Sequence, residues 1–213
     1  LDLAPHSIRA DGYQVFMQDD EGELYEIEPS PLRTLRGTVN GYSDSIVAAS
    51  LMDDGLYARV RLSNDVEFWM EPIGDRVKGA ASNSYAFYFT SDIIGSGGTC
   101  GAADHMDVGK VLEMLAVDQD ANEVANLGDV ICTTQLGVDT DYEYYQDWGS
   151  NTESRIEQVV NAINTQYEED VAISFEITTI IVRSSSNDPY TSSNAEVLLD
   201  EFGTEWSNNQ GSI

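Results

Sequence analysis

Short apolar runs interrupted by polar residues dominate the first half of the chain. They are rich in β-branched and aromatic residues and are separated by Gly, Asp, Asn and Pro, which is typical of strands joined by turns. Asp53, Asp54 and Gly55 lie between two of these runs and have the composition of a tight turn. The pattern predicts an antiparallel sheet system over about residues 30–90. The expected strands are residues 13–17, 24–27, 45–51, 56–62, 66–70 and 85–89.

The spacing of apolar residues changes in the second half. Residues 131–138 and 171–181 have the pattern of strands, and a helical pattern lies between them. A second helical pattern follows after residue 193. This order predicts a right-handed strand-helix-strand unit with parallel strands.

Both expected helices carry an apolar stripe and a start signal. Ile156, Val159, Val160, Ile163 and Tyr167 fall on one face of the first, and we expect this stripe to pack on a sheet. In the second helix, residues 195, 198, 199, 202 and 206 form the stripe. Residues 150–153 and 193–196 each have the Ser-x-x-Glu spacing of a capping box, which predicts that the helices begin there.

A segment rich in small and polar residues, about 94–109, separates the two halves and predicts a linker. The fold class expected overall is α+β. Residues 1–110 are expected to form an antiparallel β-rich domain that ends in this linker. Residues 111–213 are expected to form a connecting segment and an incomplete α/β (βαβα) domain.

The charge of the chain is strongly negative, with 38 acidic against 10 basic residues and a formal net charge of −28. Such a chain is repelled by nucleic acids and by anionic membrane surfaces, so we expect no nucleic-acid partner. No apolar run approaches the ~18 residues that a membrane helix needs, so no membrane insertion is expected. The dispersed acidic residues favour a solvated surface adapted to saline surroundings.

The two cysteines are Cys100 and Cys132. Cys100 lies in a Gly-rich stretch, where a thiolate can reach into a cleft and bind zinc in the place of a catalytic water. A disulfide between the two cysteines is the structural alternative, and it would remove that thiolate.

Three stretches carry a family resemblance. Residues 35–51 (LRGTVNGYSDSIVAASL), 54–56 (DGL) and 68–72 (FWMEP) together resemble the propeptide of reprolysin-like (adamalysin/ADAM-type) zinc metallopeptidases. Residues 135–141, the helix at 151–167 and the strand at 171–182 are similar to the start of that family's catalytic domain. The resemblance implies a precursor: a β-rich propeptide followed by the N-terminal part of a metzincin-like peptidase domain.

The resemblance also implies chemistry. The Cys100-Gly101 pair matches the family's cysteine switch, so Cys100 would be the inhibitory zinc ligand in the full precursor. The full-length protein would be a secreted enzyme that uses Zn²⁺ as its cofactor and hydrolyses peptide bonds. The partners of this chain would be the downstream peptidase domain of the same protein and the protein or peptide substrates. The family's His-Glu-x-x-His zinc motif is absent from these residues, so we expect the fragment to be inactive. Gln135 stands where the family often has a calcium-binding Glu, which leaves Ca²⁺ an open alternative.

Other acidic clusters have plainer interpretations. Residues 118–129 approach the spacing of a calcium loop but lack its glycine. Asp139, Asp141 and Glu143 favour a solvated strand end, and His105 a surface position in the linker. A non-enzymatic, acidic extracellular binding or adhesion module is the alternative to the peptidase precursor.

Overall fold

The computed structural model describes residues 1–62, 66–74, 76–94 and 131–209. The chain divides into two compact units. The larger comprises Leu1–Ile94 and Cys132–Asp188, and the smaller comprises Gly95–Ile131 and Pro189–Ile213. Cys100, His105, the expected linker and residues 118–129 lie wholly or almost wholly outside the described residues.

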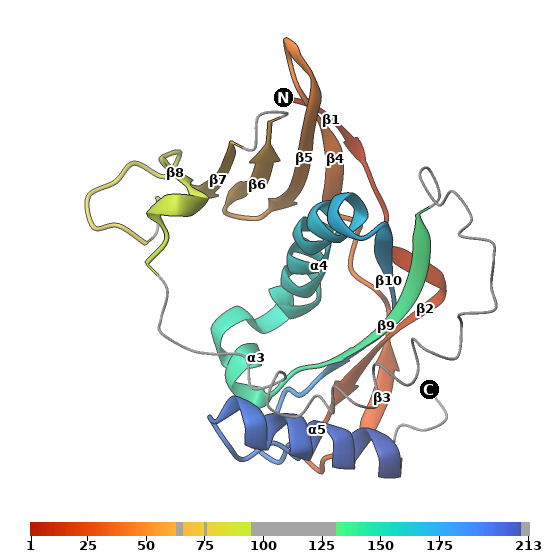
Figure 1. The fold of residues 1–213 in the computed structure, drawn as a ribbon. Coiled ribbons are helices and arrows are strands. Elements are labelled where there is room, and N and C mark those ends of the chain that lie inside the picture. The colour runs from red at the N-terminus through yellow and green to blue at the C-terminus, as the bar shows by residue number, and fades with distance from the viewer. Residues whose placement is uncertain (63–65, 75, 95–130, 210–213) are drawn as a thin grey trace, which may run out of the picture. The chain divides into compact units, whose positions relative to one another are not determined.

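Six antiparallel strands form the first sheet of the larger unit, sheet A, in the order β1-β4-β5-β6-β7-β8 (Figure 1). From β4 onward each strand pairs with the next one along the chain. This confirms the antiparallel sheet predicted for about residues 30–90. The strands are β1 (Asp2–Pro5), β4 (Thr34–Val39), β5 (Tyr42–Met52), β6 (Gly55–Arg61), β7 (Glu67–Pro72) and β8 (Tyr85–Phe89).

The first strand, β1, was not expected, because four residues ending in proline carry little alternation. It packs closely on β4 at Gly37, where a Cβ atom would lie only 1.8 Å from the carbonyl oxygen of Asp2. Glycine is therefore required for the β1–β4 contact.

Sheet B of the same unit has the order β3-β2-β10-β9. Its central strand β10 runs parallel to both β9 and β2, and β3 pairs antiparallel with β2. The parallel β9–β10 pair confirms the predicted strand-helix-strand unit. The strands are β2 (Arg9–Gln18), β3 (Leu24–Ile27), β9 (Cys132–Asp139) and β10 (Ile173–Val182).

Sheet B therefore combines strands from both ends of the chain. Val15 of β2 pairs with Ile180 of β10, and Ile177 of β10 pairs with Leu136 of β9. Residues 1–94 and 132–188 share one compact unit in consequence. The domain boundary expected near residue 110 falls outside the described residues and stays a prediction.

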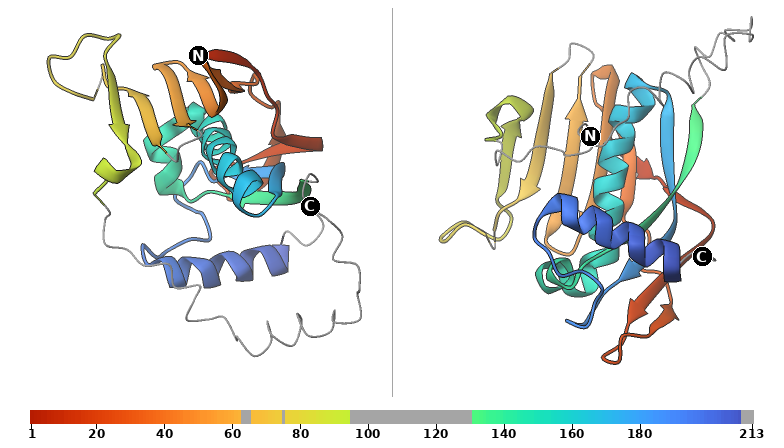
Figure 2. Two further views of the ribbon diagram at one scale, coloured as in Figure 1. Left: turned by 45° about the horizontal axis from the view of Figure 1, so that its top comes forward. Right: turned by 60° about the horizontal axis from the view of Figure 1, so that its bottom comes forward.

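One long helix lies between the two sheets. The helix α4 (Thr152–Asp170) packs on β10 on one side and on β5 on the other (Figures 1 and 2). The chain reverses after it at Ala172, whose φ of 54° is unusual for a residue other than glycine. The shorter elements of this unit are η1 (Thr90–Asp92), α3 (Tyr142–Trp148) and η2 (Gly149–Asn151).

Apolar side chains gather in two clusters. The first fills the space between sheet B and α4, where Val15, Ile177 and Ile180 are fully buried and Ile156 and Val160 contribute from the helix. The second lies on the face of sheet A that points away from α4. Its buried members are Val47, Ala49, Ala58 and Val60.

The apolar stripe expected on α4 is only half correct. Ile156 and Val160 are buried against sheet B, but Val159, Ile163 and Tyr167 are about 40% exposed at 42%, 39% and 43%. The helix has a sheet on two sides, and sheet A presents polar side chains to it. Polar residues of α4 are buried as well, and their partners lie in both sheets: Asn161 binds sheet A, whereas Glu153, Glu157 and Asn164 bind sheet B.

Neither predicted capping box forms. Asn151 precedes α4 without a side-chain cap, and the Glu153 carboxylate binds residues of the N-terminal part of the chain instead. In the smaller unit, Asn194 caps the helix α5 (Ala195–Asn209), and its side-chain oxygen accepts hydrogen bonds from the amides of Glu196 and Val197. The cap thus lies one residue after the expected Ser193.

The helix α5 differs from the prediction in burial, since none of its residues is fully buried. Phe202 and Trp206 of its expected stripe do contact each other, with ring centroids 5.2 Å apart. No helix in the described ranges is both long enough and apolar enough to span a bilayer.

Candidate functional site

Four arginines of the N-terminal part bind α4. Arg9 comes from β2, Arg36 from β4, and Arg59 and Arg61 from β6; we call them the arginine row. Their partners lie between Glu153 and Asp170, almost the full length of the helix. In a chain with only ten basic residues, this places a large share of the cations at one contact.

At the start of α4, Arg9 binds two carboxylates. Its Nε donates to Glu157 Oε1, and its Nη2 contacts Glu157 Oε2 at 3.1 Å and Glu153 Oε1 at 3.2 Å. Glu153 also accepts from the Tyr13 hydroxyl at 3.0 Å and from the Ser30 amide at 2.9 Å. The glutamate expected to cap α4 therefore attaches the helix to β2 and to the segment that follows β3.

Burial governs the ionisation of this cluster. The side chain of Glu157 is 0% exposed, and this burial raises the pKa of its carboxyl in spite of the hydrogen bond from Arg9. Burial and the two nearby glutamates also raise the pKa of the Tyr13 hydroxyl, which stays a hydrogen-bond donor. Buried ion pairs of this kind make the removal of one partner strongly destabilising.

In the middle of α4, Asn161 joins the helix to sheet A. Its side-chain nitrogen donates to the carbonyl oxygens of Leu35 at 3.2 Å and Ala49 at 3.1 Å. Its side-chain oxygen accepts from Arg36 Nε at 2.7 Å, and Arg36 Nη2 reaches the Asn161 carbonyl at 3.0 Å. One turn on, Asn164 makes the equivalent contact with sheet B through the backbone N–H and C=O of Phe175.

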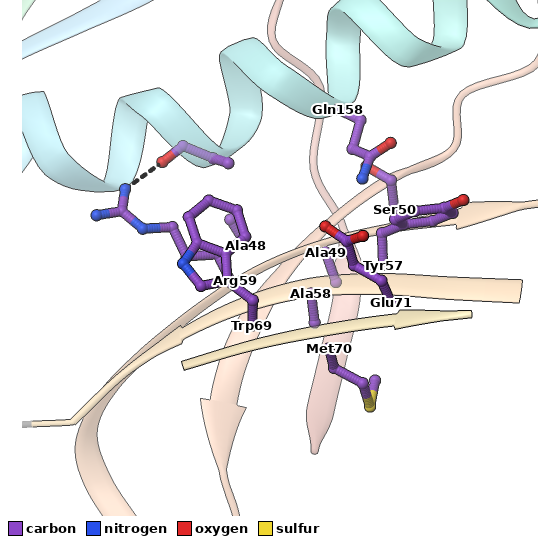
Figure 3. A pocket seen from close by; sticks show the side chains of 11 residues that line it. Ala48, Ala49, Ser50, Tyr57, Ala58, Arg59, Trp69, Met70, Glu71 and Gln158 are labelled. Atoms are coloured by element: carbon purple, nitrogen blue, oxygen red, sulfur yellow. Dashed lines mark hydrogen bonds between the residues drawn. The ribbon is translucent and has the colours of Figure 1, made fainter. Parts of the chain in front are cut away.

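Arg59 makes the densest set of contacts. It donates to the Ala162 carbonyl at 2.7 Å, to Thr165 Oγ1 at 3.1 Å and to Gln166 Oε1 at 2.5 Å, and it also pairs with Glu67. The indole ring of Trp69 lies 5.5 Å from the guanidinium carbon, within the range of a cation–π contact. Figure 3 shows Arg59 reaching the helix with Trp69 beside it.

A small hollow and a larger groove lie beside Arg59. The hollow holds about 20 Å³, room for roughly one water. Figure 3 shows Ser50, Tyr57, Glu71 and Gln158 gathered at its other end. The groove, about 340 Å³, runs along the exposed side of α4 and shares Arg59, Trp69, Glu71, Gln158 and Ala162 with the hollow.

The charged groups at this groove already have partners within the chain. Its carboxylate, Glu71, accepts a hydrogen bond from the Tyr88 hydroxyl at 2.9 Å. Arg155 stacks on Trp148 with its guanidinium carbon 4.4 Å from the ring centroid. Among the described residues that line the groove, no nucleophile stands beside a general base.

The acidic cluster at the end of β9 is only partly the solvated strand end that was expected, because Glu143 is exposed but Asp139 and Asp141 make structural contacts. The side chain of Asp139 is buried, and its two carboxylate oxygens accept hydrogen bonds from Arg183 at 2.8 and 2.7 Å. Asp141 caps α3 by accepting from the Tyr144 amide at 2.8 Å. Together with Val138, Ile156 and the other residues around them, these groups line a second hollow of about 400 Å³.

The residue expected to bind zinc, Cys100, lies outside the described residues. Cys132, at the start of β9, is an exposed free cysteine. The arginine row and its partners were not identified from the sequence. The signal was present, because Arg59 and Arg61 stand two apart in one strand and therefore share a face.

The residues that the structure describes do not fit a catalytic zinc site. No three His, Cys, Asp or Glu side chains among them lie close enough together to hold a metal ion. Their histidine, His6, lies beside Arg36, and burial together with that cation lowers the pKa of its imidazole. We therefore derive no catalytic step for this chain.

Comparison with known proteins finds a similarity in the second half of the chain. Residues 132–213 match the family model Reprolysin_5, described as metallo-peptidase family M12. No curated protein matches the chain. The matched part contains β9, α3, α4, β10 and α5, so the helix bound by the arginine row lies in a region similar to a reprolysin-type M12 peptidase.

Proposed function

We propose that the chain is part of the precursor of a secreted, zinc-dependent metalloendopeptidase. In this proposal residues 1–110 are a propeptide that ends in the linker with Cys100, and residues 111–213 are a connecting segment and the N-terminal portion of the peptidase domain. The carrying observation is that α4, a helix within the matched region, is bound along its length by arginines from the N-terminal part.

The propeptide would act as a folding partner of the peptidase region. The polar face that α4 turns toward sheet A has its hydrogen-bond partners in β4, β5 and β6. Without residues 1–94, Asn161 would lose these partners, Glu157 would lose Arg9 of β2, and β10 would lose its pairing with β2. Unpaired polar groups and an open strand edge favour misfolding, so the N-terminal part supports the first helix and strands of the peptidase.

We assign to Cys100 the role of keeping the precursor inactive. In a precursor that also holds the zinc ligands, its thiolate would occupy the coordination position that a water needs. Zinc supplies a polarised water for peptide-bond hydrolysis when that position is open. The downstream peptidase domain would be the partner of Cys100, and proteins or peptides would be the substrates after the propeptide is removed.

The test uses the product of the complete gene. We expect the Cys100→Ser precursor to cleave a casein or peptide substrate before any propeptide processing, while the wild-type precursor does not. Cys132→Ser is the matched control, because Cys132 is the other cysteine and is exposed. Equal latency of wild type and Cys100→Ser would remove the switch, and a product without zinc-dependent hydrolysis would overturn the peptidase assignment.

A further inference from the structure

The face of sheet A opposite α4 is apolar throughout its paired strands. In β5, Ala48 and Ser50 point toward α4, while Val47, Ala49 and Leu51 point away from it. The strand register extends this division, because each residue that points away is paired with another apolar one. Across β4 to β8, no paired position on this face carries a charged side chain.

Large side chains on this face are exposed. Phe87 is 59%, Leu51 56% and Phe89 45% exposed, although the small residues at the centre are buried beneath their neighbours. Phe68 and Phe87 stack with centroids 4.4 Å apart, and Phe89 meets Phe87 edge-on at 6.2 Å. We call this surface the aromatic face.

Among the described residues of the larger unit, no other helix or strand packs on it. The left view of Figure 2 shows α4 and sheet B on one side of sheet A, which leaves the other side without a packed element. Six strands spaced at about 4.8 Å and roughly five residues long give this face an area on the order of 500 Å². Contiguous exposed apolar surface of that size marks an interaction site more often than a solvated surface.

We propose that the aromatic face is a homodimer interface, in which two copies of this chain stack sheet on sheet. A face without charges suits its own copy, because no like charges meet when it is paired with itself. A basic partner would require carboxylates on the face, and none is present among its paired positions. The electrostatics of the face therefore favour a second copy over a charged partner.

The size and geometry of the aromatic face agree with a second copy of the chain as its partner. Two such faces bury on the order of 1,000 Å², about the smallest area expected of a specific interface, so we expect a weak and reversible dimer. Sheets that pack face to face lie about 10 Å apart with strands at roughly −30°, an arrangement that one twofold axis generates. Repulsion between two copies of charge −28 opposes the dimer at low salt, so we expect dimerisation to strengthen as salt screens it.

The test measures the mass of the full chain by sedimentation equilibrium at increasing KCl. We expect wild type to dimerise, and Phe87→Glu to weaken the dimer by at least about 30-fold, because it removes an exposed aromatic side chain and places a charge in an apolar interface. Leu199→Glu is the matched control, because Leu199 of α5 is 56% exposed, is not one of the residues of the face, and its variant should dimerise as wild type does.

Leu51→Glu is a second variant on a different strand of the same face. It tests the proposal independently if Phe87→Glu fails to fold. Circular dichroism of each variant reports whether its fold is intact. A monomeric wild type at 100 µM and high salt would overturn the proposal, and so would a dimer that both face variants leave intact. The outcome is independent of the metallopeptidase assignment, because it requires no zinc and no Cys100.

Discussion

Asn161 Oδ1 and Arg36 Nε lie 2.7 Å apart, in a hydrogen bond that joins the middle of α4 to β4. The same amide donates to two carbonyl oxygens of sheet A, so all of its hydrogen-bonding atoms are used. This one buried side chain connects the region similar to a peptidase to the N-terminal sheet.

Replacing Asn161 by alanine should destabilise the chain markedly. The change leaves the Leu35 and Ala49 carbonyls and the Arg36 Nε without this partner, which costs about 2–4 kcal/mol. Urea unfolding monitored by tryptophan fluorescence gives the free energy of unfolding. Val159→Ala, on the exposed side of the same helix, should cost less than about 1 kcal/mol. Equal losses in the two variants would show that the Asn161 contacts contribute little.

Replacing Arg59 by lysine should also destabilise, although the charge is kept. An ammonium cannot reproduce the fork of donors that reaches Ala162, Thr165 and Gln166, so we expect a loss of about 2–3 kcal/mol. Arg33→Lys is the matched change at a surface pair, whose partner Asp53 is 69% exposed. It should cost less than about 0.5 kcal/mol. Denaturant midpoints compare the two, and a stable Arg59→Lys would contradict the assigned role.

His6 should make stability depend on pH in the mildly acidic range. Burial, and next the Arg36 charge, lower the pKa of its imidazole from the usual 6.5, with Glu168 opposing. Because the unfolded chain then binds the proton more tightly, the stability from neutral His6 is present above pH 6.5 and is lost as pH falls through the lower folded pKa. NMR titration of the imidazole should give a midpoint below 6.5. Arg36→Gln should raise that midpoint, and an unchanged midpoint would exclude Arg36 as a cause.

Salt should stabilise the chain. Its 38 acidic residues repel one another, and raising KCl from 0.1 to 1 M shortens the screening distance from about 10 to about 3 Å. We expect the melting temperature to rise over that range when it is measured at low protein concentration, where dimerisation does not contribute. A melting temperature that falls with KCl would mean that the ion pairs of the arginine row outweigh the repulsion.

The strands were predictable because alternation within a short run is a local property. The positions of residues 45–51 and 56–62 in adjacent antiparallel strands follow from the turn at Asp53 and Asp54. The place of α4 was not predictable in the same way. A helix pattern shows which residues are apolar, but it does not show that sheets on both sides of the helix will bury Asn161 and Glu157.

The arginine row was missed for a related reason. An arginine in a strand is read as a solvent-facing residue unless its partner is known, and the partners of Arg36 and Arg59 lie far along the chain. The scarcity of basic residues was the available clue, since a few cations among many carboxylates are rarely left unpaired.

The pairing of β2 with β10 sets an order for folding. Sheet A joins neighbours in sequence from β4 to β8, so it can form early and rapidly, whereas sheet B has to bring together β2 and β10, which lie far apart in the sequence. During synthesis on the ribosome, β2 therefore waits until β10 has emerged. Before β10 has emerged, sheet A therefore provides the folded surface on which α4 can pack.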